Sequence, residues 1–225
     1  MSVGILIADE LTIPPGIESL DDFRRWALSD EFPERARIDF IRGMIEVEFM
    51  PERLSSHGAV KVEVVRVLAN RVWETDLGEI YVDQARVSSP EAALSAEPDI
   101  VVLEHETIES GRVRLIPAAD ADDFVEIEGA PDLVVEIVSP SSVGKDTKRL
   151  PPAYFDAGVR EYWLIDARGE ELVFRLFRRG ESGFEETPAD REGFRPSGVL
   201  GRRYCLDRRR GRRDEWRYDL RESVT

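Results

Sequence analysis

The sequence predicts an α/β domain in which a central mixed β-sheet carries a helix on each face. Short runs rich in β-branched residues, bounded by Gly, Pro or Asp, are typical of strands. Two other segments combine apolar spacing or proline and glycine placement in a way that is typical of helices. Hydrophobic residues make up 42% of the 225 positions, which is enough for one packed core, so we expect a single domain.

A short helix and a hairpin are predicted near the N-terminus. Residues 15–30 place apolar side chains on one helical face, and Ser19 precedes them as an N-cap. Residues 38–50 alternate between apolar and polar side chains on both sides of Arg42 and Gly43. This alternation predicts two strands joined by a tight turn.

A long helix is expected over residues 55–76, where Ser55 or Ser56 would cap an amphipathic segment. On this helix, Lys61 and Arg66 are interpreted as part of the solvated face. The strands of the sheet then follow as Ile80–Val87, Ile100–Leu103, Val113–Ile116, Phe124–Ile127 and Leu133–Val138.

A compact helix over residues 151–158 completes the second half of the core, with proline at its start and Gly158 as its stop. A buried strand, Glu161–Asp166, follows, and Leu172–Phe177 is expected beside it. Its aromatic residues Tyr162 and Trp163 are interpreted as core residues.

The core is expected over about residues 35–180, and residues 181–225 are expected to form a peripheral β-appendage. This last part concentrates positive charge in a cluster that consists of Arg202, Arg203, Arg208, Arg209, Arg210, Arg212 and Arg213. If the protein binds nucleic acid, this cluster is the candidate for phosphate contacts, and pairing with acidic residues of the same chain is the alternative.

Composition limits the chemistry that the protein can carry out. The single cysteine, Cys205, excludes an internal disulfide and a cysteine zinc site, and His57 and His105 are too few for a histidine-rich centre. A bound metal would therefore have oxygen ligands, which favours Mg²⁺ or Mn²⁺. The N-terminus resembles neither a signal peptide nor a membrane span, so we expect a cytoplasmic protein that contacts no membrane.

The net charge of −15 is unusual for a protein that binds nucleic acid, although the local field at the binding face decides affinity. The sequence contains no Gly-rich phosphate loop, no Gly-x-Ser-x-Gly motif and no Cys-His pair arranged for catalysis. NTPase, serine-hydrolase and thiol chemistry are therefore poorly supported.

Two carboxylates are the candidates for an active site. Glu136 interrupts the apolar run Leu133–Val138, where an unpaired ionised side chain would be costly, so it must be paired, protonated or bound to a metal. Asp99 follows Pro98 and precedes another apolar strand. Carboxylates on neighbouring strands can share one divalent cation. A structural ion pair at Glu136 and turn chemistry at Asp99 are the alternatives.

Several segments, in order, resemble the Uma-two family of endonuclease-like proteins, which belongs to the PD-(D/E)XK, or restriction-endonuclease-like, superfamily. The resemblance extends over about residues 35–170. It rests on residues 42–46, 55–58, 97–99, 131–142, 145–147 and 154–166, including Glu97-Pro98-Asp99, Pro131-Asp132-Leu133-Val134-Val135-Glu136 and Lys145-Asp146-Thr147.

The resemblance implies a restriction-endonuclease-like core with Asp99 and Glu136 as metal ligands. The superfamily's lysine belongs two residues after the acid, where this chain has Val138, so Lys145 or Lys148 would take its place, on a loop before the helix. The resemblance favours Lys145, because it includes the triplet Lys145-Asp146-Thr147. His57 would assist at the same cleft, with a capping or packing histidine as its alternative. Glu46 is a further candidate ligand, with a solvated strand position as its alternative.

The predicted function is hydrolysis of phosphodiester bonds in DNA by a Mg²⁺- or Mn²⁺-dependent nuclease, which we expect to act as a homodimer. One alternative is an inactive protein of the nuclease fold that binds nucleic acid or a protein partner. A sugar- or nucleotide-directed enzyme that uses the same carboxylates as acid and base is a weaker alternative.

Overall fold

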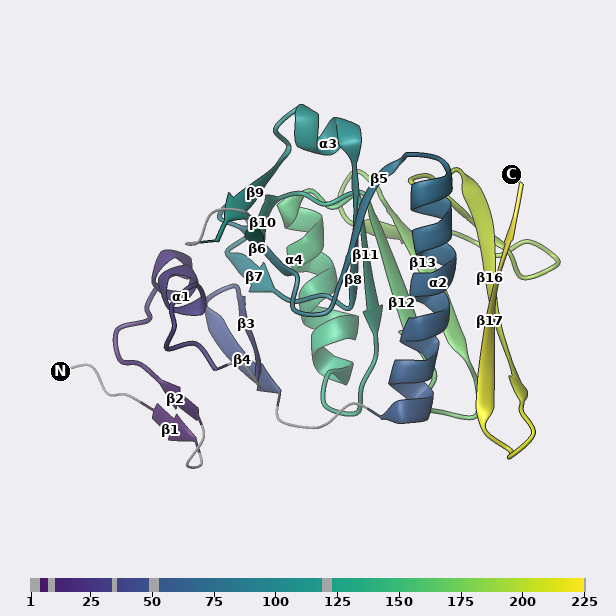
Figure 1. The fold of residues 1–225 in the computed structure, drawn as a ribbon, viewed down its shortest axis with the longest axis horizontal. Helices are drawn as coiled ribbons and strands as arrows, with labels where there is room; N and C mark the ends of the chain where they lie inside the picture. Colours follow the sequence, from purple (N-terminus) through teal and green to yellow (C-terminus); the bar gives the residue numbers. More distant parts are fainter. Residues whose placement is uncertain (1–4, 8–10, 34–35, 49–52, 119–122, 225) are drawn as a thin grey trace.

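A computed structural model describes residues 5–7, 11–33, 36–48, 53–118 and 123–224 of the chain (Figure 1). The fold is a mixed α+β arrangement with a central six-stranded sheet, as the sequence predicts. Its strand order is β14-β13-β12-β11-β8-β5, and within the described part of this sheet β11 and β12 are parallel while the other neighbours are antiparallel. The strands are β5 (Gly78–Val82), β8 (Ile100–Glu104), β11 (Leu133–Ile137), β12 (Glu161–Asp166), β13 (Val173–Arg179) and β14 (Phe184–Glu186).

Helices α2 (Ala59–Glu74) and α4 (Leu150–Ala157) cover opposite faces of this sheet. The alternation along β11 decides which side chains meet each helix, because successive residues of a strand point to opposite faces. Leu133 and Val135 pack with α2, whereas Val134 packs with α4. Glu136 therefore points to the side of α4.

A second six-stranded sheet, which the sequence did not predict as a separate layer, lies beside α4 (Figure 1). Its order is β4-β3-β7-β6-β10-β9, with strands β3 (Arg37–Ile41), β4 (Met44–Glu48), β6 (Arg86–Ser89), β7 (Leu94–Ala96), β9 (Val113–Pro117) and β10 (Phe124–Gly129). The two sheets share a core in which Val87 and Ile127 contact Val101 and Leu103 of β8. This layer brings the β3–β4 hairpin close to the carboxyl end of β11.

The predicted N-terminal helix and hairpin are confirmed. Helix α1 (Leu20–Ala27) begins after Ser19, whose side chain accepts the N–H of Asp22 and completes a capping box. Arg42 and Gly43 adopt positive φ angles of 49° and 85° in the turn between β3 and β4. Residues 49 and 50 of the predicted hairpin lie outside the described residues. The short strands β1 (Ile5–Ile7) and β2 (Leu11–Ile13) pair before α1, and helix α3 (His105–Glu109) follows β8.

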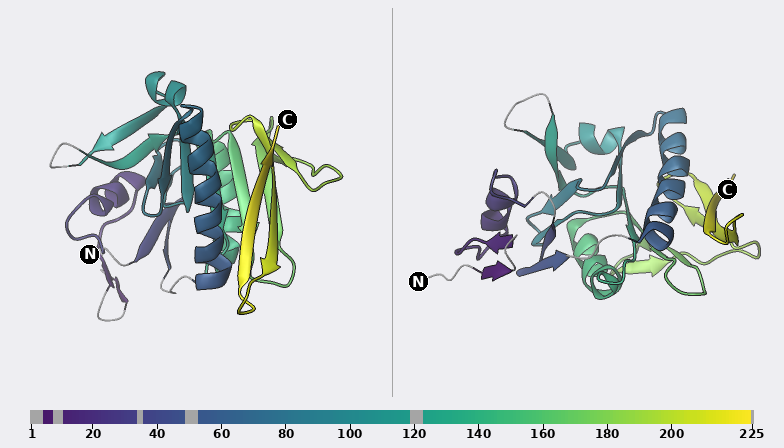
Figure 2. Two further views of the ribbon diagram at one scale, coloured as in Figure 1. Left: turned by 45° about the vertical axis from the view of Figure 1, so that its right-hand side comes forward. Right: turned by 60° about the horizontal axis from the view of Figure 1, so that its bottom comes forward.

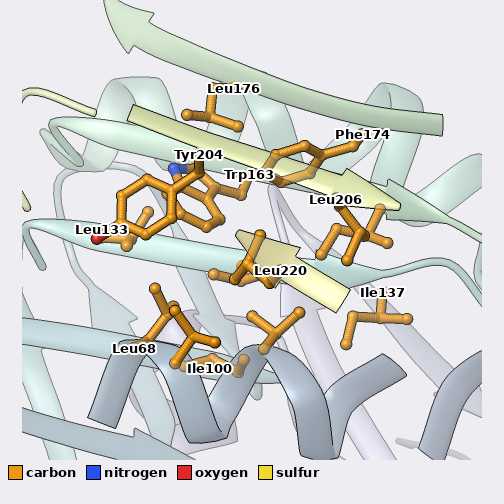
Figure 3. Close-up of a cluster of buried hydrophobic side chains, with 14 of the residues drawn as sticks. Leu68, Ile100, Leu133, Ile137, Trp163, Phe174, Leu176, Tyr204, Leu206 and Leu220 are labelled. Atoms are coloured by element: carbon orange, nitrogen blue, oxygen red, sulfur yellow. The ribbon is translucent and has the colours of Figure 1, made fainter. Parts of the chain in front are cut away.

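The C-terminal sheet lies beside α2 (Figure 2) and packs against both α2 and the central sheet. Its strands are β15 (Arg195–Ser197), β16 (Arg202–Arg210) and β17 (Trp216–Ser223). Tyr204 of β16 and Leu220 of β17 join Trp163 and Leu68 in one buried cluster (Figure 3). The β-appendage that the sequence predicts is thus part of the main core, and Trp163 is a core residue as expected.

Three local predictions were wrong. The segment predicted as the single strand Ile80–Val87 forms two strands, β5 and β6, which belong to different sheets. Ser55 and Ser56 do not cap the long helix, because they lie inside a π-helical turn, Leu54–Gly58, that runs into α2. Lys145 and Lys148 lie on a second π-helical turn, Lys145–Arg149, and not on a loop. No helix in the described ranges has the length and apolar character needed to cross a bilayer.

Candidate active site

Asp99 directly precedes β8, and Glu136 lies on the neighbouring strand β11. The antiparallel register of β8 and β11 pairs Ile100 with Val135, and one further step along this register places Asp99 opposite Glu136. There, Asp99 Oδ2 accepts a hydrogen bond from the backbone N–H of Ile137 at 2.7 Å. Both carboxyl groups are buried. The structure thus brings together the two carboxylates that the sequence predicts.

Glu136 is buried in a way that favours its protonated form. Burial raises the pKa of Glu136 well above its usual value, and the negative charges of Asp146 and Asp99 raise it further. The phenol of Tyr154, on α4, donates a hydrogen bond to Glu136 Oε1 at 2.7 Å. This bond holds the carboxyl group in one orientation.

Asp99 is held in its ionised form by three basic side chains. Its Oδ1 lies 3.1 Å from Lys61 Nζ and 3.3 Å from an Arg37 nitrogen, and its Oδ2 lies 3.5 Å from His57 Nε2. Although burial raises the pKa of Asp99, the hydrogen bond with His57 and the charges of Arg37 and Lys61 hold it well below its usual value. The two neighbouring carboxyl groups therefore differ in protonation.

The two candidate lysines occupy different environments. Lys145 is 2% exposed, and its Nζ donates to Asp39 Oδ2 at 2.8 Å and to Glu48 Oε2 at 3.0 Å. Burial by itself would lower the pKa of Lys145, but the negative charge of Asp39 opposes this effect. The pKa of Lys145 is raised overall, so the ammonium form is strongly favoured. Lys148, on the same π-helical turn, is exposed. Of these two candidates, Lys145 is therefore the one that contacts buried carboxylates.

Asp146 is a third buried carboxyl group near Glu136. Burial raises its pKa to about 7, although the neighbouring Lys145 lowers it. The hydroxyl of Ser142 donates to Asp146 Oδ2. Oδ1 has no hydrogen-bond partner among the described residues. A buried oxygen without a donor is available to bind a ligand.

Glu46, the further predicted ligand, is paired elsewhere. Its carboxylate accepts two hydrogen bonds from Arg149, one of them at 2.6 Å. Glu48, two residues later on the same strand, carries the contacts to Lys145 and, at 3.8 Å, to Arg37. Glu46 could bind a metal only after its bonds with Arg149 were broken.

The interpretation of Lys61 as a solvated residue was wrong, because α2 is covered by the sheet on this side and Lys61 is 7% exposed. One signal could have identified it: Lys61 follows His57 by four residues, which is one helical turn. Asp39 also went unrecognised, although it resembles Glu136 in lying between apolar residues, Ile38 and Phe40, that are both buried.

Eight ionisable side chains around Asp99 and Glu136 are called the charged cluster below, and His57 is not counted among them. It contains five carboxyl groups and three permanently basic groups: Asp39, Glu48, Asp99, Glu136, Asp146, Arg37, Lys61 and Lys145. With all of them ionised, the cluster carries two negative charges in excess, which one divalent cation would balance. Oxygen donors also suit Mg²⁺ or Mn²⁺. However, among the described residues no three His, Cys, Asp or Glu side chains converge in a metal-binding arrangement.

The arginine cluster of the C-terminal sheet is partly paired within the chain. Arg203 bonds to Asp190 at 2.6 Å, and Arg208 donates to the carbonyl of Gly169 at 2.8 Å. The guanidinium groups of Arg208 and Arg210 lie over the ring of Trp216, at 4.1 Å and 3.6 Å from its centre. The exposed members of the cluster on the turn after β16 are Arg212 and Arg213.

Comparison with known proteins identifies a family and a related fold. Residues 20–201 match the Uma2 family, which is described as "Putative restriction endonuclease". The chain is also similar in structure to a "putative nuclease belonging to DUF820" from Anabaena variabilis ATCC 29413, with a TM-score of 0.60 and 21% sequence identity over 81% of this chain and 90% of that one. No curated protein matches the sequence. The chain therefore has the restriction-endonuclease-like fold that the sequence resemblance implies.

Proposed function

The chain belongs to the Uma2 family, and from this premise we propose that it is a metal-dependent nuclease that hydrolyses phosphodiester bonds in DNA. The observation that carries the proposal is the position of Asp99 opposite Glu136, with Lys145 in the same buried cluster. The family and the related fold support a nuclease. The dependence on a metal ion and the choice of DNA as the substrate are parts of this proposal.

Asp99 and Glu136 are the residues that would hold the cation, and Asp146 could add its unbonded Oδ1. A bound Mg²⁺ or Mn²⁺ supplies a Lewis acid for a phosphoryl oxygen and lowers the pKa of a coordinated water. Glu136 would release its proton on loading, since a neighbouring dication favours the carboxylate. Tyr154 keeps that carboxylate aimed at the site.

Lys145 would stabilise negative charge on the phosphate during hydrolysis. Its ammonium group is fixed by Asp39 and Glu48, so little reorganisation is needed when the substrate binds. His57, which lies 3.5 Å from Asp99 Oδ2, would exchange a proton with the attacking water or contact a phosphate. Lys148 is exposed on the same turn and would at most contact the DNA backbone.

The proposal also includes a homodimer in the cytoplasm. Nucleases that cut both strands of a duplex often pair two sites, and the edge strands of the sheets offer surfaces for such pairing. A free cysteine, Cys205, is compatible with a reducing compartment. Light scattering at micromolar concentration would give a monomer mass if the dimer is wrong.

The decisive experiment is cleavage of single- and double-stranded DNA with Mg²⁺ or Mn²⁺ by the wild type and by Asp99→Asn and Glu136→Gln. Loss of a residue that acts on the reacting phosphate should lower the rate by at least about 100-fold. Glu74→Gln, at an exposed position of α2, is the matched control and should cut like the wild type. If Asp99→Asn and Glu136→Gln both retain full activity, the cluster is not the active site.

An inactive DNA-binding or protein-binding member of the same fold is the second candidate. It is favoured by the contacts of Asp99 Oδ1 with Lys61 and Arg37, because these basic groups take the place that a cation would need. Such a protein would bind DNA equally well with EDTA and with Mn²⁺, and it would cleave in neither condition.

A further inference from the structure

A pocket of about 540 Å³ lies on the side of α4 that faces β12, β13 and β14. This volume is in the range of small-molecule binding sites, which is about 300–1,000 Å³. The pocket is lined by aromatic rings and a few polar groups. Its lining includes Thr147, Phe155, Tyr162, Leu164, Arg175 and Phe184.

The register of the central sheet connects this pocket to Glu136. Glu136 of β11 pairs with Leu164 of β12, and Leu164 pairs with Arg175 of β13. Paired residues of adjacent strands share one face, so these three side chains form a row on the side of α4. Strands are about 4.8 Å apart, which puts the wall of the pocket one strand away from the candidate catalytic carboxyl group.

A second link runs through the π-helical turn that carries Lys145. The phenol of Tyr162 donates to the backbone carbonyl of Asp146 at 2.7 Å, while the ring of Tyr162 lines the pocket. Thr147, the next residue, also lines it. The turn that carries Lys145 therefore borders the pocket.

The aromatic side chains form a stacked set. The ring of Tyr162 is stacked with those of Phe177 and Phe184, at interplanar angles of 28° and 30° and with centroids 5.9 Å apart in both pairs. Phe155 meets Phe184 edge-on at 5.7 Å. Phe155, Phe177 and Phe184 are only partly buried. Faces of partly exposed rings are the surfaces on which nucleobases stack.

Positive charge accompanies these rings on a chain that is otherwise acidic. Arg175 is half exposed, and its only described ion pair is a 3.9 Å contact with Glu186. Arg179, four residues further along the same strand, lies 4.0 Å from the centre of the Phe155 ring. Asp156, the acidic residue of the pocket, is paired with Arg42. Arginine beside aromatic rings is typical of sites that bind single-stranded nucleic acid.

We propose that this pocket binds an unstacked nucleobase of the substrate strand, next to the phosphate that is cleaved. The inference rests on the proposed nuclease function and makes it more specific, because a base can enter the pocket only from a single strand or after leaving the duplex. Phe184 and Phe155 stack on the base, and Arg175 contacts its edge or the adjoining phosphate.

The test measures binding apart from cleavage, with Ca²⁺ in place of Mg²⁺. The probe is a single-stranded oligonucleotide of about twelve nucleotides that carries the fluorescent base aminopurine at one position, moved along the strand in a series. In the wild type, one position should be quenched by stacking on the rings. Phe184→Ala should remove this quenching and weaken binding by roughly ten-fold, which equals ~1.4 kcal/mol.

Matched variants identify the cause. Arg175→Gln should weaken binding and leave much of the quenching, whereas Arg66→Gln, at a similarly exposed arginine of α2, should change neither. Trp73→Ala removes an exposed aromatic residue outside the pocket and should also leave both unchanged. Melting curves confirm that Phe184→Ala is folded, and Arg175→Gln carries the test if it is not.

The outcomes separate this inference from the proposed function. If the wild type shows the quenching but cuts no DNA, and Phe184→Ala loses the quenching, the pocket is supported and the nuclease is refuted. If the protein cleaves DNA, and both Phe184→Ala and Arg175→Gln keep the quenching and the affinity of the wild type, the pocket is refuted and the nuclease is left intact. A change of molecular mass in Phe184→Ala, with DNA binding unaltered, would assign the pocket to contacts between copies of the chain and overturn the inference.

Discussion

The phenol of Tyr154 and the carboxyl group of Glu136 are joined by a hydrogen bond of 2.7 Å in the interior of the protein. Tyr154 comes from α4 and Glu136 from the strand beneath it, so the bond connects the helix to the sheet at the candidate active site. Because the pKa of the tyrosine is raised well above its usual value by burial and by Glu136, Tyr154 stays a donor throughout the physiological range. The orientation of Glu136 is therefore set before any ligand binds.

Metal binding should stabilise the wild type but not Glu136→Gln. A ligand that binds only the folded state raises the free energy of unfolding, and for a chain of this size each kcal/mol corresponds to about 2–4 °C in Tm. Melting curves with and without millimolar Mn²⁺ measure the gain, and Glu74→Gln should keep the wild-type shift. An equal shift in wild type and Glu136→Gln would exclude Glu136 as a ligand.

The metal-free protein should become less stable as the pH rises from about 4 to above 7. The raised pKa values of Glu136 and of Asp146, the latter about 7, mean that the folded state binds more protons than the unfolded state in this window. The stabilising contribution of these two carboxyl groups is therefore complete below the pKa that they have in the unfolded chain. It is lost as the pH rises through the pKa that they have in the folded protein. Asp99, whose pKa is lowered, loses its contribution only at more acidic pH.

Glu136→Gln removes one of these titrating groups, so the free energy of unfolding of this variant should fall less than that of the wild type between about pH 5 and pH 8. The pKa of Asp146, about 7, lies within this interval. Urea denaturation in EDTA at both ends of the interval measures the difference. A decline as steep as in the wild type would mean that Glu136 does not titrate there.

The two lysines of the π-helical turn should respond differently to substitution. Lys145→Ala leaves Asp39 and Glu48 without their buried cation, which costs about 3–5 kcal/mol, and it should abolish cleavage. The Mn²⁺-induced shift of Tm should survive in the folded fraction, since Lys145 is not a ligand. Lys148→Ala, at the exposed position, should match the wild type in stability and in rate. The reverse pattern would assign the catalytic role to Lys148.

The arginine cluster should affect DNA affinity through its exposed members. Replacing Arg209, Arg212 and Arg213 by glutamate should weaken binding and reduce the dependence of log Kd on log salt by about one unit for each lost phosphate contact. Arg203→Gln is the control, because this side chain is paired with Asp190. Unchanged affinity and salt dependence in the triple variant would show that the cluster takes no part in binding.

The sequence predicted best those features that depend on local chemistry. Glu136 could be recognised because a charge inside a buried apolar run has few explanations, and Ser19 because its capping role involves only the next three residues. Lys145 was preferred over Lys148 only through the family resemblance. In the structure Lys145 is buried and Lys148 is exposed, and the catalytic role of Lys145 stays a prediction.

The features that the sequence did not predict depend on contacts between distant segments. Lys61 is buried because β8 and its neighbours cover α2, which the polarity of the helix cannot indicate. Strand β7 has three residues, too few for an alternating pattern to be recognised. The role of Asp39 depends on Lys145, which lies 106 residues away along the chain.

The hydrogen bond between the Ile137 amide and Asp99 has a consequence for spectroscopy. An amide proton that is bonded to a charged carboxylate at 2.7 Å is strongly deshielded, so the Ile137 signal should lie downfield of most amide signals in a proton–nitrogen spectrum. Any event that draws Asp99 away would move this one resonance upfield. Ile137 is therefore a natural reporter, within the backbone itself, of whether the carboxylate beside it is engaged with the protein or with a ligand.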